Sequence, residues 1–283
     1  MDTERIRILL KVLEEGSLSA AAEALGYTPS GISRSIAALE EEIGFPLLLR
    51  QRRGVLPTGA CEEMLPAFRR SLAAAEQLRR EAEARKGLHL GTLRIGSSYD
   101  SYFPYLTERI GAFSRRFPGV RIALFEDTSS ALGAAVAEGR ADLAVISRRD
   151  GEFDWLPLER DALLAVLPRN HPLAGAAAFP LERLSEEAYI EIHPGRETDN
   201  SRLLSALEIR PRVRFACGDS LAALSLVEAG LGVTLVNALL LENWHGRTAA
   251  LPLEPPQELE IGIACPRTEA LSPAAHEFLA MLG

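Results

Sequence analysis

Apolar side chains in the N-terminal part of the chain recur at the spacing of amphipathic helices. The apolar positions within residues 6–13 fall on one helical face, and Gly16 follows as a natural helix end. Ser17 is a good capping residue for a second short helix that extends to Leu25 and gathers alanines on one side. The pattern predicts two helices joined by a tight turn.

A third helix is predicted to begin at Thr28-Pro29 and to end before Gly44. Threonine suits the N-cap position, proline suits the first helical position, and glycine suits the helix end. Its buried stripe is expected to consist of Ile32, Ile36, Leu39 and Ile43. The second and third helices, separated by a glycine-containing turn, indicate a helix-turn-helix.

Two short apolar runs, residues 45–49 and 55–58, flank a basic tip and predict a β-hairpin wing. From Gly59 to Lys86 the pattern is helical again, and Pro66 is expected either to kink this helix or to mark its first turn. A heptad seam is formed by Leu65, Phe68, Leu72, Ala75 and Ala82, with Arg79 as an interruption. The seam suits a dimerisation helix, and a solvated linker helix is the alternative.

Beyond Gly87 short apolar runs alternate with helical segments. Strands are expected at 92–97, 120–125 and 142–146, separated by helices at 103–117 and 131–138. This alternation specifies a parallel sheet covered by helices. A less regular set follows, with strands near 161–167, 188–192, 212–216, 233–236 and 259–265 and helices at 199–207, 220–229 and 273–282.

The expected fold is an N-terminal all-α winged helix-turn-helix with a long linker helix, followed by a C-terminal α/β domain of two lobes. The winged helix-turn-helix occupies residues 1–60, the linker helix 61–87 and the two-lobed domain 88–283. The first lobe comprises about 88–160 and 266–283, and the second about 161–265.

The net charge of −8 lies entirely in the second part, because residues 1–87 carry 13 Lys and Arg and 13 Asp and Glu. A nucleic-acid surface needs a local basic face, not a basic protein. No apolar stretch is long enough to span a membrane, and the charged N-terminus is unlike a signal peptide. Three widely spaced cysteines favour free thiols in a reducing cytoplasm, and neither a metal site nor a cofactor is expected.

The exposed side of the third helix carries small and polar side chains. Its N-terminal half is the part that meets base edges when such a helix enters a major groove. Arg34 is suited to a guanine edge or a phosphate, and the helix N-terminus favours a phosphate. The expected DNA contacts are Ser17, Thr28, Pro29, Ser30, Ser33, Arg34 and the wing residues Arg50, Arg52 and Arg53. A domain that binds protein is the alternative, which the small, polar character of this face disfavours.

Three segments, 16–25 (GSLSAAAEAL), 28–34 (TPSGISR) and 39–44 (LEEEIG), resemble the signature of the LysR-type transcriptional regulators. The resemblance continues through the wing and the linker helix. Weaker similarities follow in the same order at residues 93–96, 142–145, 171–174 and 228–233. The resemblance therefore covers almost the whole chain.

The resemblance implies a dimerising linker helix and an effector domain similar to type 2 periplasmic binding proteins. It implies a cytoplasmic, ligand-responsive regulator, not an enzyme, that binds double-stranded promoter DNA as a homodimer or homotetramer. RNA polymerase is a further implied partner of an activator. Two positions depart from the family pattern. Pro29 replaces a frequent glutamine, which shifts the expected base contacts to Ser30, Ser33 and Arg34, and Cys61 replaces a glycine after the wing.

Ligands of two-lobed α/β folds bind in the cleft, against strand ends and helix starts. Hydroxyls at such places suit a small polar, often anionic molecule, whereas Asp100 and Asp219 would repel a carboxylate or attract an amine. The alternative is that each of these groups only caps a helix. The expected effector contacts are Ser97, Ser98, Tyr99, Asp100, Thr128, Ser129, Ser147, Arg148, His193, Thr198, Asp219 and Ser220.

Two other classes of protein fit the sequence less well. A periplasmic solute-binding protein would share the two lobes, but it would need an export signal and no helix-turn-helix. An enzyme is disfavoured because Gly230-Leu231-Gly232 follows a helix and precedes a strand, the reverse of the dinucleotide-binding order. Asp142 is expected to lead into a strand and not to act as a catalytic acid.

Overall fold

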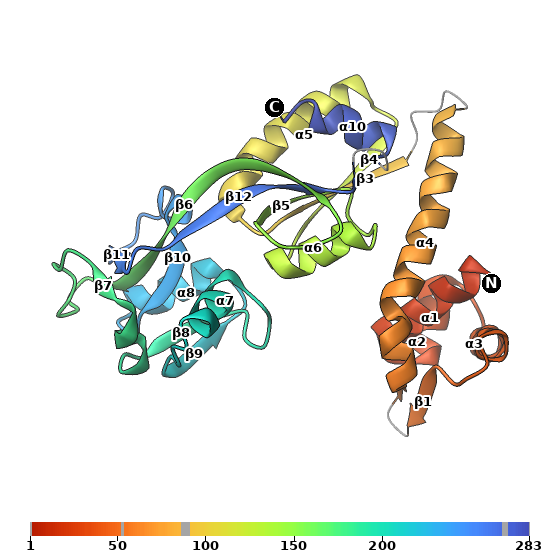
Figure 1. Cartoon of the computed structure of the whole chain (residues 1–283), viewed down its shortest axis with the longest axis horizontal. Coiled ribbons are helices and arrows are strands. Elements are labelled where there is room, and N and C mark those ends of the chain that lie inside the picture. The colour runs from red at the N-terminus through yellow and green to blue at the C-terminus, as the bar shows by residue number, and fades with distance from the viewer. Residues whose placement is uncertain (1, 52–53, 86–90, 268–270, 283) are drawn as a thin grey trace. The chain divides into compact units, whose positions relative to one another are not determined.

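The computed structural model describes residues 2–51, 54–85, 91–267 and 271–282, with the backbone alone for 76, 77 and 79–85. The chain divides into two compact units, Met1–Leu90 with Glu138–Arg140 and Gly91–Ala137 with Ala141–Gly283. Each unit has its own hydrophobic core (Figure 1). No helix within the described ranges is long and apolar enough to cross a membrane.

The first unit begins with three helices whose ends are set by local capping. They are α1 (Thr3–Glu15), α2 (Leu18–Leu25) and α3 (Pro29–Ile43). The hydroxyls of Ser17 and Thr28 accept hydrogen bonds from backbone N–H groups in the first turns of α2 and α3. Each helix ends at a glycine in left-handed backbone, which glycine adopts without strain: Gly16, Gly26 and Gly44. The predicted helices and their caps are confirmed.

The wing is an antiparallel hairpin of β1 (Leu48–Gln51) and β2 (Gly54–Pro57). It is fixed to the helices because the backbone N–H of Val55 donates to the carbonyl of Gly16 at 2.9 Å. A Cβ on Gly54 would meet the same carbonyl oxygen at 2.4 Å, so this close approach requires glycine. The hairpin therefore has a defined place beside the start of α2.

The long helix α4 (Gly59–Arg85) contains Pro66 in its interior, so this proline does not mark the first turn. Phe68 is buried in the core that α1 to α3 form, and Leu65 and Leu72 pack against the same core. Phe68 is therefore a core residue of this unit, which corrects its assignment to a dimer seam. The seam side chains at 79 and 82 lie outside the described residues.

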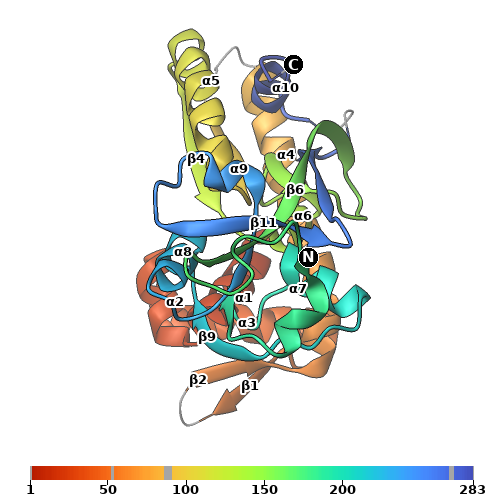
Figure 2. The same ribbon diagram turned by 90° about the vertical axis from the view of Figure 1, so that its left-hand side faces the viewer.

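In the first lobe of the second unit, three parallel strands are covered by helices on both faces. Its elements are β3 (Gly91–Ser97), α5 (Phe103–Arg116), β4 (Val120–Glu126), α6 (Ser129–Ala137), β5 (Leu143–Ser147) and α10 (Pro273–Leu279). β3 lies between β4 and β5 and is parallel to both. α5 and α10 lie side by side on one face (Figures 1 and 2), and α6 covers the other. Accordingly Leu143 and Val145 of β5 pack in the core of α5 and α10, and Ala144 and Ile146 pack with α6.

The second lobe is built around the long strand β6. Its elements are β6 (Asp154–Pro168), β7 (Phe179–Pro180), β8 (Tyr189–Ile192), α7 (Asp199–Ala206), β9 (Val213–Cys217), α8 (Ser220–Glu228), β10 (Thr234–Asn237), α9 (Ala238–Leu241), β11 (Thr248–Glu254) and β12 (Glu258–Cys265). Short 3-10 turns occupy Asp100–Tyr102 and Leu181–Ser185. β6 and β12 pair antiparallel and pass from one lobe to the other (Figure 1), and β10 and β11 pair antiparallel with β6.

Most of the predicted elements of this unit are confirmed, but β7 and α9 are not predicted, and two further differences follow. The pattern does not predict β11 or residues 154–160 of β6, because both segments contain proline and residues that are depleted in strands. Residues 261–264 of β12 pair with β5, so this half of β12 belongs to the first lobe, whereas the second lobe was expected to extend to residue 265.

Candidate functional site

One face of α3 presents small and polar side chains to solvent. Ile32, Ile36 and Leu39 are buried, while the opposite side exposes Thr28, Pro29, Ser30, Arg34 and Ala37, with Ser33 half-buried. The N-cap hydroxyl of Thr28 accepts the N–H of Gly31 at 3.1 Å. The structure thus places five of the predicted DNA contacts along one exposed ridge at the start of this helix.

The wing and α3 are joined by side chains on this ridge. The guanidinium of Arg50, on β1, donates to the hydroxyl of Ser33 at 2.9 Å. One carboxylate oxygen of Glu40, on α3, accepts the N–H groups of Leu47 and Leu48 at 2.7 and 3.2 Å. The cationic side chain of Arg50 is therefore held beside the polar ridge. The remaining wing candidates, Arg52 and Arg53, lie outside the described residues.

Ser17 has a local role at the start of α2. Its side chain is half-buried and accepts the N–H of Ala20 at 3.4 Å. At the junction between wing and α4, Thr58 donates to the carbonyl of Pro46 and accepts the N–H of Cys61. Cys61 is fully buried here, so the departure from the family pattern at this position fills the core of the unit.

A cleft of about 90 Å³ lies between the two lobes of the second unit. Hydroxyl-bearing and acidic side chains from the ends of β3 and β4 meet side chains from the segment before α7 and from the start of α8. Eight of the predicted effector contacts line it: Ser98, Tyr99, Asp100, Thr128, Ser129, His193, Thr198 and Ser220. The expected strand ends and helix starts do meet in one cavity.

The other four predicted residues lie elsewhere. Ser97 and Ser147 are buried and are not among the residues that line the cleft. Asp219 caps α8, because its carboxylate accepts the N–H of Ala222 at 2.7 Å. Thr198 both lines the cleft and caps α7 by accepting the N–H of Ser201. For Asp219 the helix-cap alternative is the better description, and Thr198 combines the two roles.

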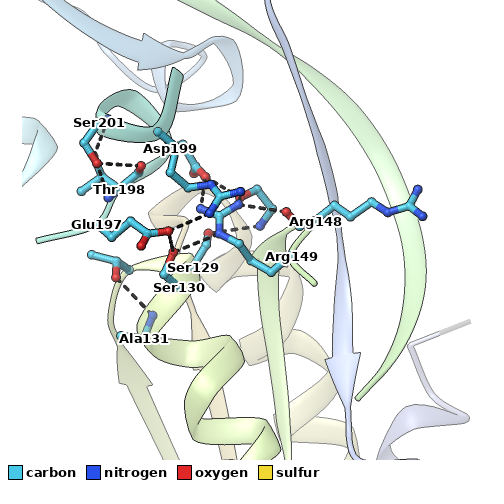
Figure 3. Close-up of polar contacts among 12 residues, drawn as sticks. Ser129, Ser130, Ala131, Arg148, Arg149, Glu197, Thr198, Asp199 and Ser201 are labelled. Carbon is cyan, nitrogen blue, oxygen red and sulfur yellow. Dashed lines mark hydrogen bonds and ion pairs between the residues drawn. The ribbon is translucent and has the colours of Figure 1, made fainter. Parts of the chain in front are cut away.

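Arg148 is not among the residues that line the cleft, and its neighbour Arg149 lies where Arg148 was expected. Arg148 is exposed and pairs with Glu260 at 3.1 Å, away from the cluster around Arg149 (Figure 3). Side chains alternate between the two faces of a strand, so Arg149 shares a side with the buried Ser147. That period of two is the sequence signal that identifies Arg149.

Asp199, the first residue of α7, joins the two lobes. Its carboxylate accepts hydrogen bonds from Tyr99 at 2.9 Å and from the hydroxyl of Ser147. It also accepts one from the guanidinium of Arg149 at 2.5 Å (Figure 3). The side chains of Arg149 and Asp199 are only 8% and 14% exposed. This ion pair is therefore strongly shielded from water.

Two further contacts connect the same segment of the second lobe with the first lobe. Ser130 donates to Glu197 at 2.9 Å and accepts from Arg149 at 3.0 Å. Arg196 pairs with Asp127. Residues 196–199 thus bridge the cleft through polar contacts to the first lobe at positions 196, 197 and 199.

The carboxylates that line the cleft differ in whether a cationic side chain pairs with them. Burial, followed by the charge of Asp219, raises the pKa of Asp100, and His193 partly opposes this shift. Burial also raises the pKa of Glu126, and the charges of Asp100, Asp219 and Asp127 add to the increase. Among the described residues, neither Asp100 nor Glu126 forms an ion pair. The cleft therefore contains two acidic groups, the half-buried Asp100 and the exposed Glu126, that have no ion-pair partner among the described residues.

Several residues of the cleft were missing from the sequence-based set. Glu126 and Asp127 directly precede the predicted Thr128, and Asp199 directly follows the predicted Thr198. Their acidic side chains next to a helix start were a usable signal. The apolar wall, formed by Leu163, Ile192, Leu235, Val236, Leu240 and Leu259, has no local sequence signal because its members are ordinary core residues.

The three cysteines differ in expected reactivity. Burial raises the pKa of Cys61 and of Cys265 to about 11, whereas Cys217 is only half-buried and its pKa is raised less. A thiol with a pKa of about 11 is only about 0.1% thiolate at pH 8. We expect iodoacetamide at pH 8 to label Cys217 first in the folded protein, as measured by peptide mass spectrometry, with urea-unfolded protein as the control. Equal labelling of Cys61 or Cys265 before unfolding would contradict this assignment.

Known proteins resemble the chain along its whole length. The family described as "Bacterial regulatory helix-turn-helix protein, lysR family" matches residues 3–62, and "LysR substrate binding domain" matches residues 86–283. The probable HTH-type transcriptional regulator LrrA of Synechococcus elongatus is 31% identical, over 100% of this chain and 96% of its own length.

Solved structures have the same fold at lower sequence identity. A full-length OxyR variant from Pseudomonas aeruginosa has a TM-score of 0.65 and 21% identity, over 100% of this chain and 93% of that one. Full-length CbnR in complex with its target DNA has a TM-score of 0.60 and 22% identity, over 100% and 99% of the two chains.

Proposed function

The chain belongs to the LysR family of bacterial transcriptional regulators, and on this premise we propose how its parts act. α3 and the wing bind promoter DNA, and the cleft between the lobes binds a small effector molecule. The observation that carries the DNA-binding part is the exposed ridge of α3, where Ser30, Ser33 and Arg34 stand opposite a fully buried stripe.

The chemistry of the ridge supports contact with both bases and phosphates. Ser30 and Arg34 are exposed in the first half of α3, the half that reaches base edges when a recognition helix enters a major groove. The positive end of the helix dipole at the start of α3 favours a phosphate. Arg50, held beside Ser33, adds a cation for the sugar-phosphate backbone.

We place the effector in the cleft because polar groups from both lobes converge there. A ligand in this position contacts the segment 196–199, whose side chains already bridge the lobes. Ligand binding therefore changes the balance of the bridging contacts. A coupling of about 1–3 kcal/mol between such a site and the DNA-binding unit is enough to change promoter occupancy several-fold.

The proposed assembly is a homodimer or a pair of dimers that places α3 helices on successive major-groove faces, about one helical turn apart. Leu78 on α4 is 69% exposed, which leaves apolar surface for a partner helix beyond the part that closes the core. As an activator, the protein would also contact RNA polymerase. Promoter DNA as the target implies action in the cytoplasm.

The test is a salt-series titration with the promoter region beside the protein's own gene, compared with scrambled DNA of equal length. We expect specific binding that persists at physiological salt, with a linear decrease of log affinity against log salt. Equal affinity for both DNA molecules, together with no enriched sequence in a genome-wide selection of bound fragments, would refute specific DNA recognition.

Replacing Arg34 with alanine is expected to weaken binding to the specific DNA by about 1–3 kcal/mol if it contacts a base edge. Fluorescence anisotropy measures this change. Arg115→Ala, which removes the same charge from an exposed position on α5, is the matched control and leaves the affinity unchanged. An equal loss on scrambled DNA would assign Arg34 to a phosphate, and no loss on either DNA would remove it from the interface.

A further inference from the structure

The charges that line the cleft are almost all acidic. Four carboxylates face it, from Asp100, Glu126, Asp127 and Asp199, together with the imidazole of His193. Among the described lining residues there is no lysine or arginine. The cleft taken alone therefore repels anions, in contrast to the anionic ligand that its hydroxyls and helix starts suggest.

The two arginines at the border of the cleft are already neutralised from within the protein. Arg149 pairs with Asp199 at 2.5 Å and donates further hydrogen bonds to Ser130 and Ser147. Arg196 pairs with Asp127. A carboxylate ligand would have to displace one of these internal carboxylates to find a cation.

The helix starts around the cleft are also occupied. The N-cap side chains Thr128, Thr198 and Asp219 accept N–H groups in the first turns of α6, α7 and α8. The carboxylate of Asp199 lies at the start of α7, where a ligand anion would otherwise be favoured. The positions that attract anions in this fold therefore already have their acceptors.

From this charge balance we propose that the effector is a small organic cation with an ammonium group that binds between Asp100 and Glu126. The proposal rests on the proposed function of the cleft as the effector site. These two carboxylates have no cationic partner among the described residues, and an apolar wall that includes Leu163, Leu235 and Val236 suits an aliphatic stem. Each ammonium–carboxylate contact replaces water by a charge-assisted hydrogen bond.

The pKa shifts of these two carboxylates agree with the same assignment. Burial and the charge of Asp219 raise the pKa of Asp100, and burial and the charges of Asp100, Asp219 and Asp127 raise the pKa of Glu126. A bound cation would oppose both shifts. A metal ion fits less well, because no group of three or more His, Cys, Asp or Glu in the described ranges is placed to hold one. The cavity of about 90 Å³ is small for a ligand site, so the molecule must be compact.

The experiment compares four-carbon probes that differ mainly in charge. Putrescine, butylamine, butanediol and succinate are titrated into the full-length protein by isothermal calorimetry. We expect the amines to bind, with putrescine tighter than butylamine because two carboxylates are available, and we expect no binding of butanediol or succinate. Saturable binding of succinate, or no binding of either amine at millimolar concentrations, would overturn the proposal.

Two isosteric variants locate the binding site. Asp100→Asn and Glu126→Gln are each expected to weaken putrescine binding about tenfold to hundredfold, since each removes one charged contact. Glu258→Gln removes an equal charge from an exposed position on β12 and should leave the affinity unchanged. An unchanged affinity in Asp100→Asn and Glu126→Gln would place the amine elsewhere and refute the assignment.

The same protein is titrated with specific DNA, with and without each probe. Specific DNA binding that responds to succinate and not to the amines would leave the proposed function intact and reject the cationic effector. Loss of specific DNA binding in every condition would instead reject the proposed function itself.

Discussion

Replacing Asp199 with alanine is expected to lower the free energy of unfolding of the effector unit by about 3–5 kcal/mol. The change leaves the guanidinium of Arg149, which is only 8% exposed, without its counter-charge. It also removes the acceptor of the hydroxyl groups of Tyr99 and Ser147. An uncompensated buried charge is among the most destabilising consequences of a single substitution.

Urea unfolding of the full-length protein, followed by circular dichroism, measures this loss. Glu197→Ala is the matched control, because Glu197 is a neighbouring carboxylate on the same bridge but is 55% exposed, so its removal should cost at most about 1 kcal/mol. The double variant Asp199→Ala/Arg149→Ala should recover part of the stability that the single variant loses. If Asp199→Ala costs no more than Glu197→Ala, Asp199 does not have this role.

Phe68→Ala is expected to destabilise the winged helix-turn-helix unit by about 3–5 kcal/mol, because it leaves a cavity in a close-packed core. Phe68 is fully buried among side chains of α1 to α3, so α4 forms part of the winged helix-turn-helix unit. Specific DNA binding is expected to weaken together with the thermal stability of this unit.

The control for Phe68→Ala lies on the same helix. Glu63 is exposed, so Glu63→Ala should change the unfolding free energy by no more than about 0.5 kcal/mol. Calorimetry measures stability, and analytical ultracentrifugation measures the oligomeric state. A Phe68→Ala protein with unchanged stability but weaker self-association would restore Phe68 to the dimer seam and contradict its place in the core.

The helix ends of the first unit could be predicted because their causes are local. Ser17 and Thr28 each bond an N–H three residues ahead, and Gly16 and Gly44 supply the left-handed backbone at the helix ends. The exposed face of α3 follows from the same periodicity, since Ile32, Ile36 and Leu39 fix which side is buried. Nothing beyond neighbouring residues enters this part of the prediction.

In the effector unit, alternation of strands and helices predicted the parallel sheet and the place of the cleft. It did not predict β11 or the first half of β6, because both contain prolines and charged residues. These segments form strands in the folded protein because β11 pairs with β6 and the first half of β6 pairs with β12. Pairing across 100 residues between Arg160 and Glu260, for example, has no local signal.

The sequence by itself determined the helix-turn-helix, the two-lobed class and eight of the residues that line the cleft, because capping and periodicity act within one or two turns. Only the tertiary structure decided that Phe68 closes a core and that Arg149 pairs with Asp199 of the other lobe. Above all it decided the charge of the cleft. Arg149 and Asp199 are 50 residues apart in the chain, and their pairing occupies the guanidinium beside the cleft, while Asp100 and Glu126 have no ion-pair partner among the described residues. Charge compensation depends on distances in space, which no local pattern of residues specifies.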